Sequence, residues 1–162
     1  MTSNNCWLPE LIFCDDFSRW TEYQNLIYSI FKNDFITSKP YYKGHRVLPR
    51  KEPYENGVEE SFFHITCNDY FKNNNRSPDL RRCERIKWVR SFIENYNCDL
   101  AACRNCDGVK IWEEPYKMYS RIHLLLEEER YLVVIEKRKT YYLLVTAFYF
   151  ENNHSFYKYN NT

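Results

Sequence analysis

Apolar side chains recur at helical spacing in two stretches of the chain, and each stretch begins with residues that can cap a helix. The first follows Asp15 and Asp16 and predicts a helix over about residues 16–33. The second follows Ser77-Pro78-Asp79, in which serine supplies the N-cap and proline the first helical position, and predicts a helix over about residues 78–96. The buried stripe predicted for this second helix consists of Leu80, Cys83, Ile86, Val89 and Ile93.

A second pattern, with a period of two residues, predicts strands. In Ser61–Cys67 it would place Phe62, His64 and Thr66 on one face, so we predict that His64 lies on a strand. Further strands are predicted near residues 109–112, 118–126, 131–138 and 141–150, with Glu127–Arg130 as a compact hairpin connection. Residues 39–57 are interrupted by prolines and glycines, which predicts a loop region with room for one short strand, and the polar residues 68–77 predict a mobile loop.

The order of these elements is helix, strand, helix and then antiparallel strands. It predicts an α+β fold in which N-terminal helices pack on a C-terminal antiparallel sheet. A chain of 162 residues with 44% apolar side chains suits one domain over residues 1–162, with a helical extension over about 1–35 and an α+β core over about 40–160. No run of about 18 apolar residues and no secretion signal are present, so we expect a soluble, cytoplasmic protein that does not engage a membrane.

The net charge of +1 indicates that any binding of nucleic acid depends on a local patch. The stretch from Arg76 to Arg90 holds six basic residues against two acidic ones, and Lys137-Arg138-Lys139 is a shorter basic run. Either could follow a phosphate backbone, and the alternative for each is a solvated surface. The candidate RNA-binding residues are Arg81, Arg82, Lys87, Lys137 and Lys139.

His64 is the candidate for proton transfer. Cleavage of RNA without a metal needs a group that takes the proton of the 2′-hydroxyl, a group that protonates the leaving 5′-oxygen, and donors for the phosphorane charge. Histidine titrates near working pH, and the arginine fork donates two hydrogen bonds to a phosphate. The alternative is a histidine with a structural role.

Thr146 is the second polar residue that needs an explanation. If the strand over 141–150 pairs with the strand over 131–138, then Thr140, Tyr142, Leu144, Thr146 and Phe148 share one face. A threonine among large apolar side chains is either part of a site or simply bonded to the backbone in a strand that it favours.

Several chemistries lack their sequence motifs. The chain has no phosphate-binding loop, no dinucleotide fingerprint, no nucleophile elbow and no zinc-protease motif, and it contains only 3 glycines. Nucleotide-dependent enzymes and α/β-hydrolases are therefore poor candidates.

Three segments together carry a resemblance to a known family. They are Glu60-Ser61-Phe62-Phe63-His64-Ile65-Thr66 after Gly57, Arg81-Arg82-Cys83-Glu84-Arg85-Ile86-Lys87-Trp88, and the closing run from Arg121 through YLVVIEKR to YYLLVTAFY. Over about residues 40–160 this pattern resembles the barnase–EndoU–colicin–RelE (BECR) class of phage- and toxin-associated nucleases.

The resemblance implies a metal-independent ribonuclease, a toxin or phage-defence effector that cleaves RNA, tRNA included, by 2′-hydroxyl attack and is held in check by an immunity or antitoxin protein. It implies that His64 is the acid–base residue, that Arg85, Arg121 and Arg138 bind phosphate, and that Thr146 and Tyr149 position the scissile group. The chain departs from the family pattern at Thr146-Ala147-Phe148, because relatives often carry a tyrosine where this chain has Phe148.

The cysteines suggest a further site. Cys98, Cys103 and Cys106 form a C-x4-C-x2-C array, for which Cys83 or His123 could supply the fourth ligand of a structural zinc. A disulfide and free thiols are the alternatives, and the odd total of 7 cysteines favours a reducing compartment. No cofactor is expected for catalysis. The alternative function is a non-catalytic RNA- or protein-binding module with structural zinc, and a third is a catalytically inactive member of the fold.

Overall fold

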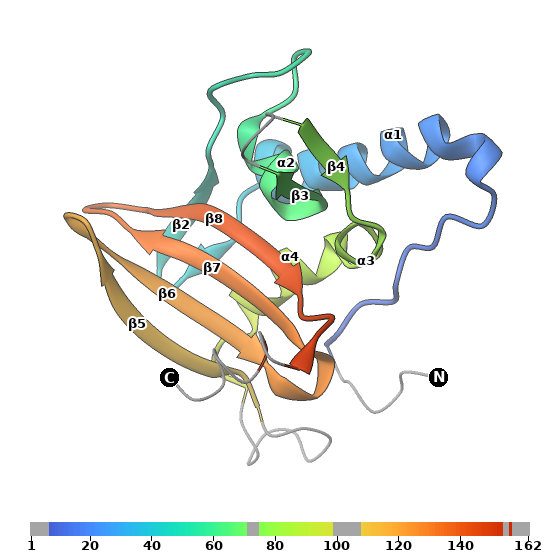
Figure 1. Cartoon of the computed structure of the whole chain (residues 1–162). Helices are drawn as coiled ribbons and strands as arrows, with labels where there is room; N and C mark the ends of the chain where they lie inside the picture. The colour runs from blue at the N-terminus through green and yellow to red at the C-terminus, as the bar shows by residue number, and fades with distance from the viewer. Residues whose placement is uncertain (1–6, 71–74, 99–107, 154–155, 157–162) are drawn as a thin grey trace.

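The computed structural model describes residues 7–70, 75–98, 108–153 and 156. The fold is α+β, as predicted: helices from the first half of the chain cover one face of a curved, mostly antiparallel sheet built chiefly from the second half (Figure 1). The sheet has six strands in the order β1-β2-β8-β7-β6-β5. The strands are β1 (Tyr41–Tyr42), β2 (His45–Pro49), β5 (Lys110–Tyr116), β6 (Tyr119–Leu126), β7 (Tyr131–Lys137) and β8 (Tyr142–Tyr149).

The first predicted helix is confirmed and is longer than expected. A 3₁₀ turn η1 (Phe17–Arg19) leads into α1 (Trp20–Phe31), which continues as a π-helical turn η2 (Lys32–Thr37). The Asp16 carboxylate accepts a hydrogen bond of 3.0 Å from the Ser18 amide, so the predicted cap forms. Tyr23, Ile27 and Phe31 are buried in the same core as the helix-facing side of the sheet.

The predicted strand over Ser61–Cys67 is wrong, because this segment is the helix α2 (Glu60–Thr66). Ser61 and Ile65 are buried one helical turn apart, and the helix also brings Glu60 and His64 together at i and i+4. A short run of apolar residues fits both a helix and a strand, so its packing decides between them. Here the hydroxyl of Tyr28 donates to Glu59, at the start of α2, over 2.7 Å and anchors the helix to α1.

The described parts of the predicted loop over residues 68–77 are strands. In the described part, β3 (Cys67–Tyr70) pairs antiparallel with β4 (Asn75–Pro78). The second predicted helix is divided at Arg85 into α3 (Leu80–Glu84) and α4 (Ile86–Glu94). Its N-cap is Asp79, which accepts from the amides of Arg81 and Arg82, because Ser77 and Pro78 belong to β4 instead. The predicted buried stripe is correct for Cys83, Ile86, Val89 and Ile93, whereas Leu80 is partly buried.

The predicted strands at the end of the chain are confirmed, and β6 and β7 are joined by a 3₁₀ turn over Glu127–Glu129. The predicted common face of β8 is wrong, because a bulge interrupts its pairing: Val134 pairs with Thr146 and Ile135 with Leu144. One extra residue reverses the alternation of side chains beyond it. Tyr142 and Leu144 therefore belong to the core beneath the helices, whereas Phe148 belongs to a second cluster on the opposite face.

Candidate active site

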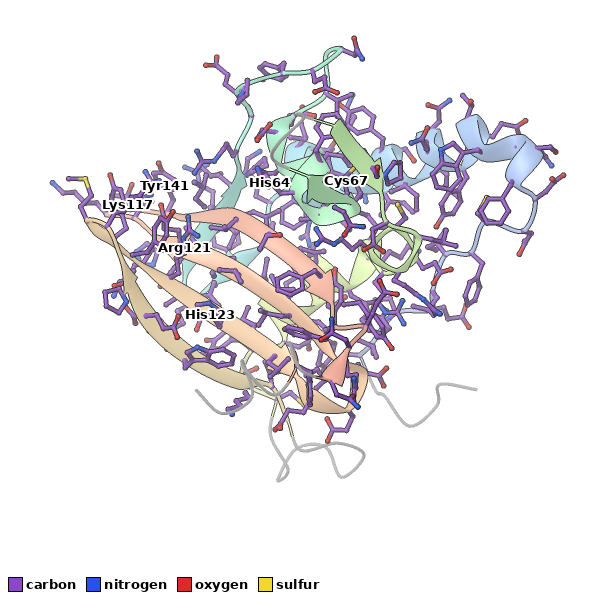
Figure 2. The ribbon with its side chains drawn as sticks, viewed as in Figure 1. His64, Cys67, Lys117, Arg121, His123 and Tyr141 are labelled. Carbon is purple, nitrogen blue, oxygen red and sulfur yellow. The ribbon has the colours of Figure 1, made fainter. Side chains whose placement is uncertain are left out.

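A cleft of about 890 Å³ lies between α2, the sheet face turned away from the main helical core, and the tip of the β5–β6 hairpin. Four of the six predicted catalytic residues line it, namely His64, Arg121, Arg138 and Thr146. Figure 2 shows His64 on α2, Arg121 on β6 and Lys117 at the hairpin tip. The cleft therefore unites side chains that are far apart in the sequence.

His64 and Glu60 form an imidazole–carboxylate pair at the edge of this cleft. Nε2 of His64 lies 2.8 Å from Oε2 of Glu60, and their side chains retain 28% and 11% of their accessible surface. The carboxylate orients the ring through this contact. A histidine held in this way and still exposed to the cleft can exchange a proton with a bound molecule.

Two arginines share one buried carboxylate on the floor of the cleft. Nε of Arg121 lies 3.1 Å from Oε1 of Glu136, and Nε of Arg138 lies 2.8 Å from Oε2 of Glu136. Burial by itself would raise the pKa of Glu136, but the hydrogen bonds and charges of Arg138 and Arg121 lower it below its ordinary value. Glu136 is therefore an ionised anchor for the arginines and a poor proton acceptor.

Each arginine also stacks on a tyrosine. The guanidinium carbon of Arg121 lies 3.5 Å from the centre of the Tyr116 ring, and that of Arg138 lies 3.9 Å from the centre of the Tyr119 ring. Within the part of the chain that the structure describes, no acceptor is bonded to the Nη groups of Arg121. The stack and the Glu136 bond together fix a guanidinium whose outer donors can reach a ligand.

The charges of the cleft favour an anion. Its lining includes the four cationic side chains Arg50, Lys117, Arg121 and Arg138 and the two carboxylates of Glu60 and Glu136. The local balance is thus +2 with His64 neutral, although the whole chain carries only +1. Because the arginines lie within the cleft, solvent screens their field less than on an open surface.

The Thr146 hydroxyl donates to the main-chain oxygen of His64 over 2.9 Å. A hydrogen bond to the backbone was one of the two explanations that the sequence allowed for a threonine among large apolar side chains. The bond crosses from β8 to α2, so it joins the sheet to the helix that carries the histidine.

Arg85 and Tyr149 lie together but outside the cleft. Arg85 is buried on the helical side of the sheet, with its guanidinium carbon 4.4 Å from the centre of the Tyr149 ring and 5.0 Å from that of Trp88. Tyr149 packs against the core on this side, and its neighbour Phe148 packs against the cluster on the other side, as strand alternation requires.

The predicted RNA-binding residues lie outside the residues that line the cleft. Arg81, Lys87, Lys137 and Lys139 are exposed on different elements, and none of them lines the cleft. Arg82 is half-buried, where one Nη atom donates to two main-chain oxygens. These basic residues are therefore distributed over several elements of the fold.

Sequence reasoning missed several residues of this face, namely Arg50, Glu60, Glu136, Tyr116 and Tyr119. The signals were the i, i+4 spacing of Glu60 and His64 and the Glu-x-Arg alternation of Glu136 and Arg138. The ring of His123, which the sequence offered as a possible fourth zinc ligand, stacks on Trp112 at a centroid distance of 4.9 Å. Burial lowers the pKa of His123, which favours its neutral form.

The proposed zinc ligands are only partly described. Cys103 and Cys106 lie outside the described residues, Cys98 is half-buried, and burial raises the pKa of the Cys83 thiol to about 12. Among the described residues, no group of three or more His, Cys, Asp or Glu side chains is arranged to hold a metal ion. No described helix is both long and apolar enough to cross a bilayer.

Comparisons of the chain with protein-family models, with curated proteins and with solved structures give no match.

Proposed function

We propose that this protein is a metal-independent endoribonuclease whose active site is the cleft between α2 and the sheet. The observation that carries the proposal is that a carboxylate-bound histidine and two stacked arginines line the same cleft. Acid–base catalysis and stabilisation of phosphate charge are the two requirements for cleavage of RNA by its own 2′-hydroxyl.

In the proposed reaction, the 2′-oxygen attacks the adjacent phosphorus and its proton passes to the imidazole of His64. The P–O5′ bond breaks, the imidazolium of His64 gives its proton to the leaving 5′-oxygen, and the products are a 2′,3′-cyclic phosphate and a 5′-hydroxyl. Arg121 and Arg138 bind the non-bridging oxygens, where negative charge accumulates in the transition state. Glu60 stabilises the imidazolium that forms during attack, and Glu136 holds the two arginines in place.

The proposal extends to biological context. Uncontrolled cleavage of RNA in the cytoplasm would harm the cell that makes the enzyme, so a toxin or phage-defence effector of this kind requires an immunity or antitoxin protein. The local positive charge of the cleft suits an inhibitor that presents carboxylates to it.

The test is cleavage of total RNA and tRNA by purified wild-type protein and by His64→Ala, with EDTA present. The proposal expects discrete cleavage by the wild type, products that end in cyclic phosphate, and no cleavage by a folded His64→Ala variant. Equal cleavage by both proteins would remove His64 from the mechanism. Intact RNA in both lanes, with RNA bound, would favour the alternative function, a non-catalytic RNA-binding module, and would direct attention to zinc at the cysteines.

A further inference from the structure

We propose that Thr146 and Arg82 are positioning residues that hold His64 in the cleft by jointly binding its main-chain oxygen. The inference rests on the proposed function for its catalytic consequence, whereas its structural part can be tested separately. It assigns Thr146 a role through the histidine rather than at the phosphate.

The position of His64 depends on the helix α2, which carries it. The helix has 7 residues, and an isolated helix of that length is not stable in water. The last carbonyl groups of an α-helix lack partners within the helix. In α2 the Phe63 oxygen accepts from the amide of the C-cap Cys67, so the carbonyls that need other partners are those of His64, Ile65 and Thr66. The position of His64 therefore depends on what those carbonyls bind outside the helix.

Donors from other elements occupy these positions. The His64 oxygen accepts from the Thr146 hydroxyl of β8 over 2.9 Å and from an Nη atom of Arg82 in α3 over 3.0 Å. The same Nη atom donates to the oxygen of Cys67 over 2.6 Å. The Thr66 oxygen accepts from the amide of Asp79 over 2.8 Å. The end of α2 is thus fixed to the sheet on one side and to α3 on the other.

The hydrogen bond of the Thr146 hydroxyl also excludes a role for this hydroxyl as a donor to phosphate. A hydroxyl has one proton to donate, and in this structure Thr146 donates it to the His64 oxygen. A phosphate oxygen accepts hydrogen bonds and cannot supply one, so Thr146 cannot bind phosphate as a donor while this bond is intact. Because Thr146 and His64 both line the cleft, loss of the bond would shift the histidine relative to the arginines.

The experiment compares Thr146→Val, which removes the hydroxyl at nearly constant shape, with Thr146→Ser, which keeps it. The first measurement is the ¹⁵N chemical shift of the His64 ring, with Glu60→Gln as the reference for an imidazole that has lost its carboxylate. We expect the ring signals of Thr146→Val to move toward those of Glu60→Gln and those of Thr146→Ser to match the wild type. Wild-type signals in Thr146→Val would overturn the inference.

The second measurement is the kinetics of RNA cleavage. A shift of the histidine should lower kcat of Thr146→Val by about 10- to 100-fold at unchanged KM, because misplacement by about 1 Å costs up to about that factor. Thr146→Ser should restore kcat. A raised KM at unchanged kcat would instead indicate a phosphate contact and would overturn the inference.

Two outcomes separate this inference from the proposed function. If the wild type cleaves no RNA, the proposed function fails, but the ring signals still test whether Thr146 positions His64. If Thr146→Val does not fold, Arg82→Lys serves in its place, since one ammonium group has shorter reach than the guanidinium and should also displace the His64 signals. Unchanged signals in a folded Arg82→Lys would overturn the role of Arg82.

Discussion

The Glu60 carboxylate lies 2.8 Å from Nε2 of His64, one turn away on the helix α2, for which the sequence pattern had predicted a strand. The pair has the features of an orienting carboxylate and a proton-transfer group. In the proposed reaction, this pair acts through the carboxylate charge as well as through the hydrogen bond.

Glu60→Gln separates these two contributions. The amide can still accept a hydrogen bond, but it lacks the charge that stabilises the imidazolium. We expect kcat for RNA cleavage to fall by about 10-fold or more, with little change in KM, and we expect Glu60→Asp to retain more activity than Glu60→Gln. Steady-state kinetics on one fluorescent RNA substrate would measure this, and equal rates for Glu60→Gln and the wild type would contradict the role of the pair.

Arg121→Met should weaken RNA binding through loss of a phosphate contact. We expect the affinity to fall at every substrate sequence and the slope of log Kd against log salt to decrease by about 1. Arg46→Met is the matched control, because Arg46 is exposed on β2 and does not line the cleft. Fluorescence anisotropy at several salt concentrations, with the His64→Ala background to prevent cleavage, would show whether the two arginines differ.

Glu136→Gln should lower both stability and activity. The variant leaves two arginines without their shared carboxylate, so we expect a loss of about 2 kcal/mol in the free energy of unfolding at neutral pH. The folded pKa of Glu136 is lowered from 4.5, so its contribution is present above that pH and is lost as the pH falls through the folded value. Urea denaturation of both proteins at pH 7 and below pH 4 should show the difference shrinking at the lower pH.

Asp34→Asn should raise the free energy of unfolding, whereas Glu136→Gln should lower it. Burial raises the pKa of Asp34 from 3.8 to about 6 despite the nearby charges of Arg90 and Lys87. The folded state thus binds more protons between these values, and stability decreases as the pH rises through that window. Because Asp34 is only partly buried, we expect Asp34→Asn to stabilise the protein by about 1 kcal/mol above pH 6 and to match it below pH 4. A stability gain that persists at low pH would point to a cause other than ionisation.

Arg85→Met tests the role that the family resemblance implied for Arg85. Because Arg85 stacks on Trp88 and Tyr149 outside the cleft, we expect kcat and KM of the folded variant to be unchanged. Removal of the guanidinium also leaves the buried Glu84 without its ion pair at 3.5 Å, so thermal unfolding should show a loss of about 2 kcal/mol. Loss of activity at normal stability would support the phosphate-binding role that the resemblance implied for Arg85.

The sequence by itself determined the elements whose pattern is long and regular. The first helix and the stripe from Cys83 to Ile93 follow from helical periodicity. The strands β6, β7 and β8 follow from long runs of apolar residues. The α+β class follows from their order.

Tertiary structure decided the rest. Ser61–Thr66 became a helix because Glu59, Ser61 and the carbonyls at its end are bound by other elements, which a local pattern of seven residues cannot reveal. The bulge opposite Val134 and Ile135 reversed the alternation of β8, which placed Thr146 on the opposite face of the sheet from Leu144. The cleft exists only where helix, sheet and hairpin tip meet, since charge and hydrogen bonding act over distance in space rather than along the chain.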